Sequence, residues 1–132
     1  GDDTIYGEAG GDHLIGDAGN DRLDGGTGND VLVGIAGDDT LFGRAGDDQF
    51  FGDSAAANHF SITGEDTMYG GPGKHRFGGG PGPDRYFGEA DDDFLYACDR
   101  GPDVVDGGPG TDSAYEDRGL DVVKDVESLN TC

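Results

Sequence analysis

A nine-residue period runs through most of this 132-residue chain, and it constrains the fold more than any other feature. Between Gly7 and Phe51 the sequence reads, in nines, GEAGGDHLI, GDAGNDRLD, GGTGNDVLV, GIAGDDTLF and GRAGDDQFF. Each nonamer has Gly at its first and fourth places, Asp at its sixth and a large apolar residue at its eighth. Because a unit this short contacts only its neighbours, the period predicts a solenoid of stacked strands and turns.

The period becomes irregular in the second half of the chain. Residues 52–69 span two periods, and Ala57 stands where Asp is expected, so we interpret this stretch as one decayed repeat followed by a regular one. Further along, His75 replaces an Asp, Asp91 replaces a fourth-place Gly, and Ala97 is one extra residue. The frame then resumes, which favours local degeneration of one repeat array over a second kind of domain.

These observations predict a simple domain organisation. We expect one nonapeptide-repeat domain over residues 1–124, degenerate around 52–63 and 88–97, followed by a short C-terminal cap over 125–132, which contains no glycine. The chain begins in mid-repeat and without Met, which we interpret as a fragment. A repeat stack needs such caps because its two ends expose unpaired strands.

The composition limits the classes of function. Only 33% of the residues are hydrophobic and the net charge is −21, which would normally indicate disorder unless a cation neutralises the chain. Eight basic residues among 29 acidic ones argue against nucleic acid as a partner. No apolar run is long enough to span a membrane. Acidic pairs such as Asp47-Asp48 follow from repeat places and no catalytic motif is present, so we predict no enzyme and no small-molecule substrate.

The sixth-place Asp is the candidate metal ligand of each repeat. We expect places seven to nine to form a strand with its apolar side chain inward, and the other six residues to form a turn. If two nonamers make one coil, turns two repeats apart stack about 4.8 Å from each other on the same edge. Carboxylates at that distance repel unless a cation lies between them, and carboxylate and carbonyl oxygens suit Ca²⁺ better than Mg²⁺.

Counting repeats assigns the sixth-place residues to two edges. One edge should carry Asp12, Asp30, Asp48, Asp66, Asp84, Asp103 and Asp121. The other should carry Asp3, Asp21, Asp39, Ala57, His75, Asp93 and Asp112. We therefore expect a continuous calcium row on the first edge and a gap between Ala57 and His75 on the second. About nine pairs keep both carboxylates, and about nine divalent ions would nearly neutralise the chain.

This pattern resembles the RTX, or haemolysin-type, calcium-binding repeats, and the resemblance covers Gly1 to about Lys124. It implies an all-β, right-handed parallel β-roll (β-solenoid) with Ca²⁺ in the turns on both edges. It also implies a secreted, extracellular protein that is disordered without calcium. The side-chain ligands that it implies are Asp3, Asp12, Asp21, Asp30, Asp39, Asp48, Asp66, Asp84, Asp93, Asp103, Asp112 and Asp121. The turn carbonyls lie around Gly7, Gly10, Gly16, Gly19, Gly25, Gly28, Gly34, Gly37, Gly43 and Gly46.

The inward and outward residues of the strands carry further expectations. The core should be one eighth-place residue per nonamer: Ile5, Leu14, Leu23, Leu32, Leu41, Phe50, Met68, Phe77, Tyr86, Leu95, Val105 and Val123. The outward ninth places hold Tyr6, Phe42, Phe51, Phe60, Tyr69, Phe87, Tyr96 and Tyr115. These rings either stack on one another as cross-strand ladders or form a surface for a partner or for self-association.

Three alternatives remain open from the sequence. Cys98 and Cys132 are either a disulfide, as expected outside the cell, or two free thiols. His59 and His75 are either metal ligands or drift at degenerate places. The chain itself is either a calcium-folded structural module, free-standing or the tail of a larger secreted protein, or an adhesin-like or ice-binding surface.

Overall fold

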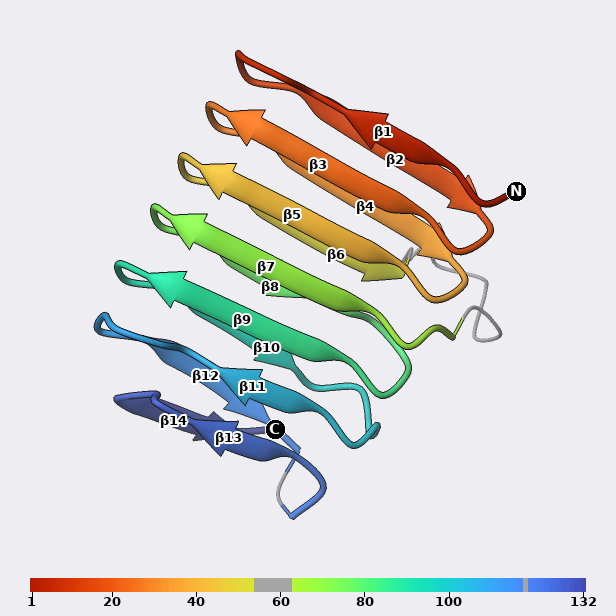
Figure 1. Cartoon of the computed structure of the whole chain (residues 1–132). Helices are drawn as coiled ribbons and strands as arrows, with labels where there is room; N and C mark the ends of the chain where they lie inside the picture. The colour runs from red at the N-terminus through yellow and green to blue at the C-terminus, as the bar shows by residue number, and fades with distance from the viewer. Residues whose placement is uncertain (54–62, 118) are drawn as a thin grey trace.

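The computed structural model describes residues 1–53, 63–117 and 119–132 as an all-β parallel solenoid of about seven turns. Two seven-stranded parallel sheets face each other, the odd strands in front and the even strands behind (Figure 1). The odd sheet contains β1 (Thr4–Tyr6), β3 (Arg22–Thr27), β5 (Thr40–Ala45), β7 (Thr67–Pro72), β9 (Arg85–Ala90), β11 (Val104–Asp106) and β13 (Val122–Lys124). The even sheet contains β2 (His13–Ala18), β4 (Val31–Ala36), β6 (Gln49–Asp53), β8 (Arg76–Gly78), β10 (Phe94–Ala97), β12 (Ser113–Glu116) and β14 (Ser128–Thr131). Among these residues there is no helix that could cross a membrane.

The strand register confirms that two nonamers make one coil. Leu14 pairs with Leu32 and Leu23 pairs with Leu41, each eighteen residues along the chain. Turns therefore stack on two edges. We call edge A the row of turns that lead into odd strands, on the right in Figure 1, and edge B the row that leads into even strands.

The core is a single row of eighth-place side chains between the two sheets, as predicted. Ten of the twelve expected residues are buried, while Ile5 and Val123 in the end strands β1 and β13 are only partly buried. Ala97 and Ala114 join the core although neither was expected. Ala114 occupies an eighth place, so the register and not its size puts it inside.

Most strands are longer than the expected three residues because they continue into the next nonamer, whereas β1, β8, β11 and β13 have three. In β2 the chain stays paired from His13 to Ala18, so that Asp17 lies beside Ile35 of β4. Both of these second-place residues have a left-handed backbone, with φ of 73° and 96°. This local bend carries each strand into its turn without breaking the ladder.

The coil does not follow the predicted count across residues 52–69. Thr40 pairs with Thr67 and Gln49 with Arg76, steps of twenty-seven residues where eighteen were expected. The pairing of the described strands therefore skips one whole period, and the prediction of two consecutive repeats was wrong. The reason lies in the sequence SAAANHFSI at 54–62, which has neither Gly nor Asp to form a turn of this type.

Described residues on either side of 54–62 hold the repeat places of this turn. Gly52 and Asp53 open the turn, Gly64 takes the fourth place and Asp66 the sixth. A Cβ added to Gly64 would touch the carbonyl of Gly37, the fourth-place residue of the preceding turn on edge A. Ala57, His59 and Phe60, for which we made predictions, lie outside the described residues.

The C-terminal residues extend the even sheet. β14 pairs with β12 in parallel, so that Leu129 lies beside Ala114. A disulfide links Cys132 to Cys98, with the two Cα atoms 6.1 Å apart. It ties the end of the chain to the edge A turn that begins at Cys98.

Candidate metal sites

Sixth-place carboxylates link each turn to the turn one coil earlier. Asp39 Oδ1 accepts a hydrogen bond from the N–H of Asp21 at 2.8 Å, and Asp84 Oδ1 accepts one from Asp66 at 2.9 Å. The same bond recurs along both edges. The ladder buries most of these carboxylates, since they point along the stack and not into solvent.

The ladder corrects the predicted membership of the two edges. Edge A carries Asp3, Asp21, Asp39, Asp66, Asp84, Asp103 and Asp121, linked in this order. Edge B carries Asp12, Asp30, Asp48, His75, Asp93 and Asp112, and ends on Glu127. The extra period at 54–62 shifts every later turn to the other edge. The expected gap between Ala57 and His75 thus becomes a single histidine between Asp48 and Asp93.

The second carboxylate oxygen of the ladder is the clearest sign of cation sites. In Asp12, Asp30 and Asp48 on edge B, Oδ2 is buried and has no hydrogen-bond partner among the described residues. The other ladder members in this state are Asp21, Asp39, Asp66, Asp93, Asp103 and Asp112. Buried polar atoms are nearly always satisfied, and an ionised carboxylate is far costlier to bury than a neutral group. A row of such oxygens fits a row of cations.

First-place glycines create the space beside these oxygens. A Cβ added to Gly7 would lie 2.5 Å from the carbonyl oxygen of Gly25 and 2.8 Å from Asp12 Oδ2. Gly34, Gly52 and Gly88 have the same pair of neighbours, a carboxylate of their own turn and a carbonyl of the next turn on the edge. Hard oxygen donors converge where a side chain would otherwise stand, and that donor set fits Ca²⁺.

Burial raises the pKa of the ladder carboxyls in the metal-free fold. The pKa of Asp66 rises to about 8, chiefly through burial and also through the neighbouring carboxylates of Asp84, Asp53 and Asp39. The pKa values of Asp84, Asp93 and Asp103 rise to about 7 for the same reasons. Hydrogen bonds from backbone N–H groups oppose these shifts without cancelling them. A nearby cation would favour the charged forms instead.

His75 takes the place of a carboxylate in the edge B ladder. Its Nδ1 accepts a hydrogen bond from Asp48 N–H at 3.2 Å, and its Nε2 lies 3.3 Å from the carbonyl of Gly71. Burial lowers its pKa, which keeps the imidazole neutral. A Cβ on Gly70 would lie 2.5 Å from the ring, so the imidazole fills the space that Oδ2 borders in other turns. Backbone groups thus satisfy both ring nitrogens. The ladder steps on either side of His75 have one aspartate each, Asp48 in one and Asp93 in the other.

Two further acidic residues lie beside the edge A ladder and were not predicted. Asp84, Asp99 and Asp103 each place a carboxylate oxygen within 4.8 Å of the others. Asp53 is buried with Oδ1 unpartnered, and burial raises its pKa to about 6. Asp53 and Asp99 are both second-place residues of edge A turns. The sequence signal for both residues is an acidic second place in turns of the same edge. This signal is recognisable only once the turns are assigned to the correct edges.

The comparison with known families agrees with this geometry. The chain matches the family model described as RTX calcium-binding nonapeptide repeat (4 copies) over residues 1–32, 24–56 and 78–97. No curated protein and no solved structure matches the chain. The matched segments span more than half of the sequence, so this chain belongs to the RTX calcium-binding nonapeptide repeat family, whose repeats bind Ca²⁺.

Proposed function

We propose that this chain is a structural module that folds as it binds several Ca²⁺ ions outside the cell. It acts either alone or as the repeat tail of a larger secreted protein. The module binds calcium and is not an enzyme. The repeat pattern explains why each ladder carboxylate is present, so no catalytic role is needed to account for these residues. Its ligands are the sixth-place aspartates of edges A and B together with the carbonyls of the turns.

The row of unpartnered Oδ2 atoms carries this proposal. Nine ladder aspartates hold such an atom in a buried position, in a chain of net charge −21. Without cations, neighbouring carboxylates repel through a poorly solvated interior. With cations, the same oxygens become ligands, and ions that bind only the folded chain stabilise it by mass action.

An extracellular setting is supported by one feature of the structure and by one general property of calcium modules. The Cys98–Cys132 disulfide is of a kind that persists in oxidising compartments. Extracellular calcium modules bind with dissociation constants of about 10⁻⁴ to 10⁻³ M, which suits a protein that meets millimolar calcium only after export. The chain would then remain open inside the cell and fold outside it.

Circular dichroism with a calcium titration tests the proposal. We expect a spectrum of a largely unfolded chain in EGTA and a strand-rich spectrum in millimolar CaCl₂, with MgCl₂ much less effective because Mg²⁺ demands a stricter octahedron. Isothermal titration of the folded end point counts the ions. Strand content that is complete in EGTA and unchanged by calcium would disprove the proposal.

A matched pair of variants locates the binding oxygens. Asp39→Asn removes the charge of a buried ladder aspartate, whereas Asp38→Asn alters its exposed neighbour. We expect Asp39→Asn to raise the calcium concentration at the folding midpoint severalfold and Asp38→Asn to leave it nearly unchanged. Equal shifts would mean that overall charge, and not the ladder, controls folding.

A further inference from the structure

Gly78 is a glycine that neither the backbone nor the packing requires. Between Gly16 and Gly110, every other described glycine has a left-handed φ or would bring a Cβ within 3.0 Å of another atom. At Gly78 the nearest atom to an added Cβ is the carbonyl oxygen of Phe50, at 4.0 Å, and φ is not left-handed. A larger residue would fit there, so the missing side chain calls for another explanation.

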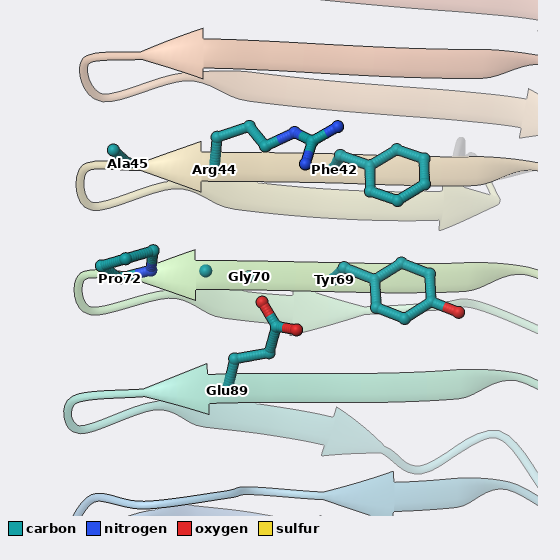
Figure 2. Close-up of a pocket in the computed structure, with 8 residues that line it drawn as sticks. Phe42, Arg44, Ala45, Tyr69, Gly70, Pro72 and Glu89 are labelled. Carbon is teal, nitrogen blue, oxygen red and sulfur yellow. The ribbon is translucent and has the colours of Figure 1, made fainter.

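The odd sheet shows what the corresponding position holds when it is filled. Tyr69 lies on β7 between Phe42 of β5 and Phe87 of β9, with ring centroids 5.1 and 5.0 Å apart and both ring pairs within 9° of parallel. Figure 2 shows Phe42 and Tyr69 side by side on the outer face, with Arg44 beside Phe42. Three aromatic rings thus stack on successive strands without a break.

The even sheet has the same arrangement with its central ring missing. Gly78 of β8 pairs with Phe51 of β6 on one side and with Tyr96 of β10 on the other. Both flanking rings are exposed, Phe51 by 45% and Tyr96 by 48%. Since neighbouring strands lie about 4.8 Å apart, the two rings flank a space about one stacked ring wide.

This space opens into a larger groove on the even sheet. The groove has a volume of about 990 Å³ and is lined along the sheet by Gln49, Phe51, Arg76, Gly78, Phe94 and Tyr96. A cavity of this size suits a small molecule. The hollow beside Tyr69 on the odd sheet measures only about 300 Å³.

Arg76 places a positive charge in the groove, whose lining also contains Arg100 and the edge A aspartates Asp53 and Asp99. It lies two residues before Gly78 on β8, so both positions face outward on the same strand. None of the ion pairs in the described part of the chain involves Arg76 or Arg100, which also lines the groove. In a chain of net charge −21, two guanidinium groups without carboxylate partners beside exposed rings are complementary to an anionic ligand.

We infer that the groove over β6, β8 and β10 binds a planar aromatic ring that carries a carboxylate. The ring inserts over Gly78 between Phe51 and Tyr96, in the position that Tyr69 occupies on the odd sheet. The carboxylate pairs with the guanidinium of Arg76. Flat rings stack on both walls at the distances that this fold already uses, and the aromatic row of the even sheet becomes continuous when the ligand is bound.

Binding of 2-naphthoate to the calcium-loaded protein tests the inference. Fluorescence anisotropy of naphthoate should report saturable binding at one site, with perturbation of the Gly78 amide signal in a nitrogen–proton NMR spectrum. Gly78→Tyr fills the space and should weaken binding by about tenfold or more, since the stacking on both walls is lost. Arg76→Gln should weaken it about threefold, which is typical of an exposed ion pair.

Controls separate this site from general apolar binding. Gly78→Tyr should keep its circular dichroism spectrum and its calcium stoichiometry, because an added Cβ meets no atom closer than 4.0 Å. If that variant does not fold, Phe51→Ala removes one wall of the space and should also weaken binding severalfold. The non-planar cyclohexanecarboxylate and the uncharged 2-naphthamide should both bind more weakly than naphthoate. The inference is overturned if naphthoate does not bind, binds a folded Gly78→Tyr or Phe51→Ala protein equally well, or binds no better than either analogue.

Discussion

Edges A and B of the solenoid are built from the same repeat, but a histidine stands in the ladder of edge B. On edge A every ladder residue from Asp3 to Asp121 is an aspartate, and six hydrogen-bonded steps join them. Edge B has three such steps among the residues described, because His75 interrupts its ladder. The difference shows two ways to stack the same turn, one that leaves an anionic oxygen in need of a cation and one in which a neutral ring satisfies the backbone.

The largest effect should follow from removing a carboxylate in the middle of edge A. Asp66→Ala deletes a ligand shared by the steps to Asp39 and to Asp84, so we expect the loss of two bound calcium ions. At free calcium a hundred times the dissociation constant, two such sites stabilise the fold by about 5 kcal/mol. Chemical denaturation in CaCl₂, together with calcium counting, measures both losses.

A neighbouring residue provides the control for this change. Glu65→Ala removes an exposed carboxylate from the same turn and should leave both the ion count and the denaturation midpoint nearly unchanged. On edge B, His75→Ala should lower stability without reducing the ion count. An Asp66→Ala protein that retains every ion would show that carbonyls alone hold calcium on edge A.

Restoring the ladder on edge B should make the two edges alike. His75→Asp replaces the imidazole with a carboxylate between Asp48 and Asp93, and we expect the calcium count to rise by two. In millimolar calcium the fold should gain about 2 to 3 kcal/mol, less than two full sites provide, because the hydrogen bonds of the imidazole are lost. In EGTA the same variant should be less stable than the wild type, since it adds a buried charge.

The exposed residue His13 provides the matched control for this substitution. His13→Asp makes the same chemical change on β2, outside the ladder, and should add no ion. Thermal melts of both variants in CaCl₂ and in EGTA separate the outcomes. A stoichiometry that stays constant in His75→Asp would mean that the backbone of this turn, and not its side chain, prevents calcium binding.

The nine-residue period determines the register and the core of the solenoid, but it does not determine which edge each later turn joins. The register of two nonamers per coil and the inward row from Leu14 to Val105 follow directly from the spacing. The edge assignment did not, because the extra segment 54–62 is one full period long and leaves the frame undisturbed. An extra segment of nine residues cannot be detected by counting repeats, because the frame stays the same. It nevertheless moves every later sixth-place residue to the opposite edge.

Other features of the site depend on neighbours that only the stack brings together. Asp99 follows the first place of its repeat and has no special status in a sixth-place pattern. It becomes a candidate ligand because the turns of Asp84 and Asp103 lie on the same edge beside it. Similarly, the His75 ring could be interpreted as drift until the structure placed its nitrogens against backbone groups of its own turn and of the preceding edge B turn.

The pH dependence should reverse when calcium is removed. A carboxyl whose pKa is higher in the fold than in the unfolded chain stabilises the fold below the unfolded pKa, and this contribution is lost as the pH rises through the folded pKa. The pKa values in the metal-free fold rise from 3.8 to about 6 for Asp48, about 7 for Asp84 and about 8 for Asp66, chiefly through burial. The calcium-free chain should therefore gain structure as the pH falls from 8 to 5.

Calcium should invert this trend, because bound ions require ionised ligands and protons then compete with them. The calcium-loaded protein should lose stability over the interval in which the calcium-free chain gains it. Edge A contains Asp66, whose pKa is the highest of the ladder carboxyls cited, so its sites should weaken first on acidification. Circular dichroism at pH 5, 6, 7 and 8, each with EGTA or CaCl₂, provides the comparison, and parallel pH profiles in the two conditions would contradict it.

The smallest expected effect concerns a difference within edge A itself. Asp99 adds a third carboxylate to the step between Asp84 and Asp103, so we expect Asp99→Asn to weaken calcium binding at this step about fivefold without abolishing it. In EGTA the change has two opposing consequences. It relieves repulsion with Asp84 and Asp103, but it also weakens the bonds that the carboxylate accepts from Gly82 N–H at 2.9 Å and Gly101 N–H at 2.5 Å.

Asp17→Asn provides the control for this variant, because Asp17 is an exposed second-place residue of an edge A turn and Asn tolerates its left-handed backbone. Calcium titration should resolve a change in the binding curve for Asp99→Asn and none for Asp17→Asn. If the two variants bind calcium alike, the Asp84–Asp103 step is an ordinary ladder step, and the acidic second places serve only to hold their turns together through backbone N–H groups.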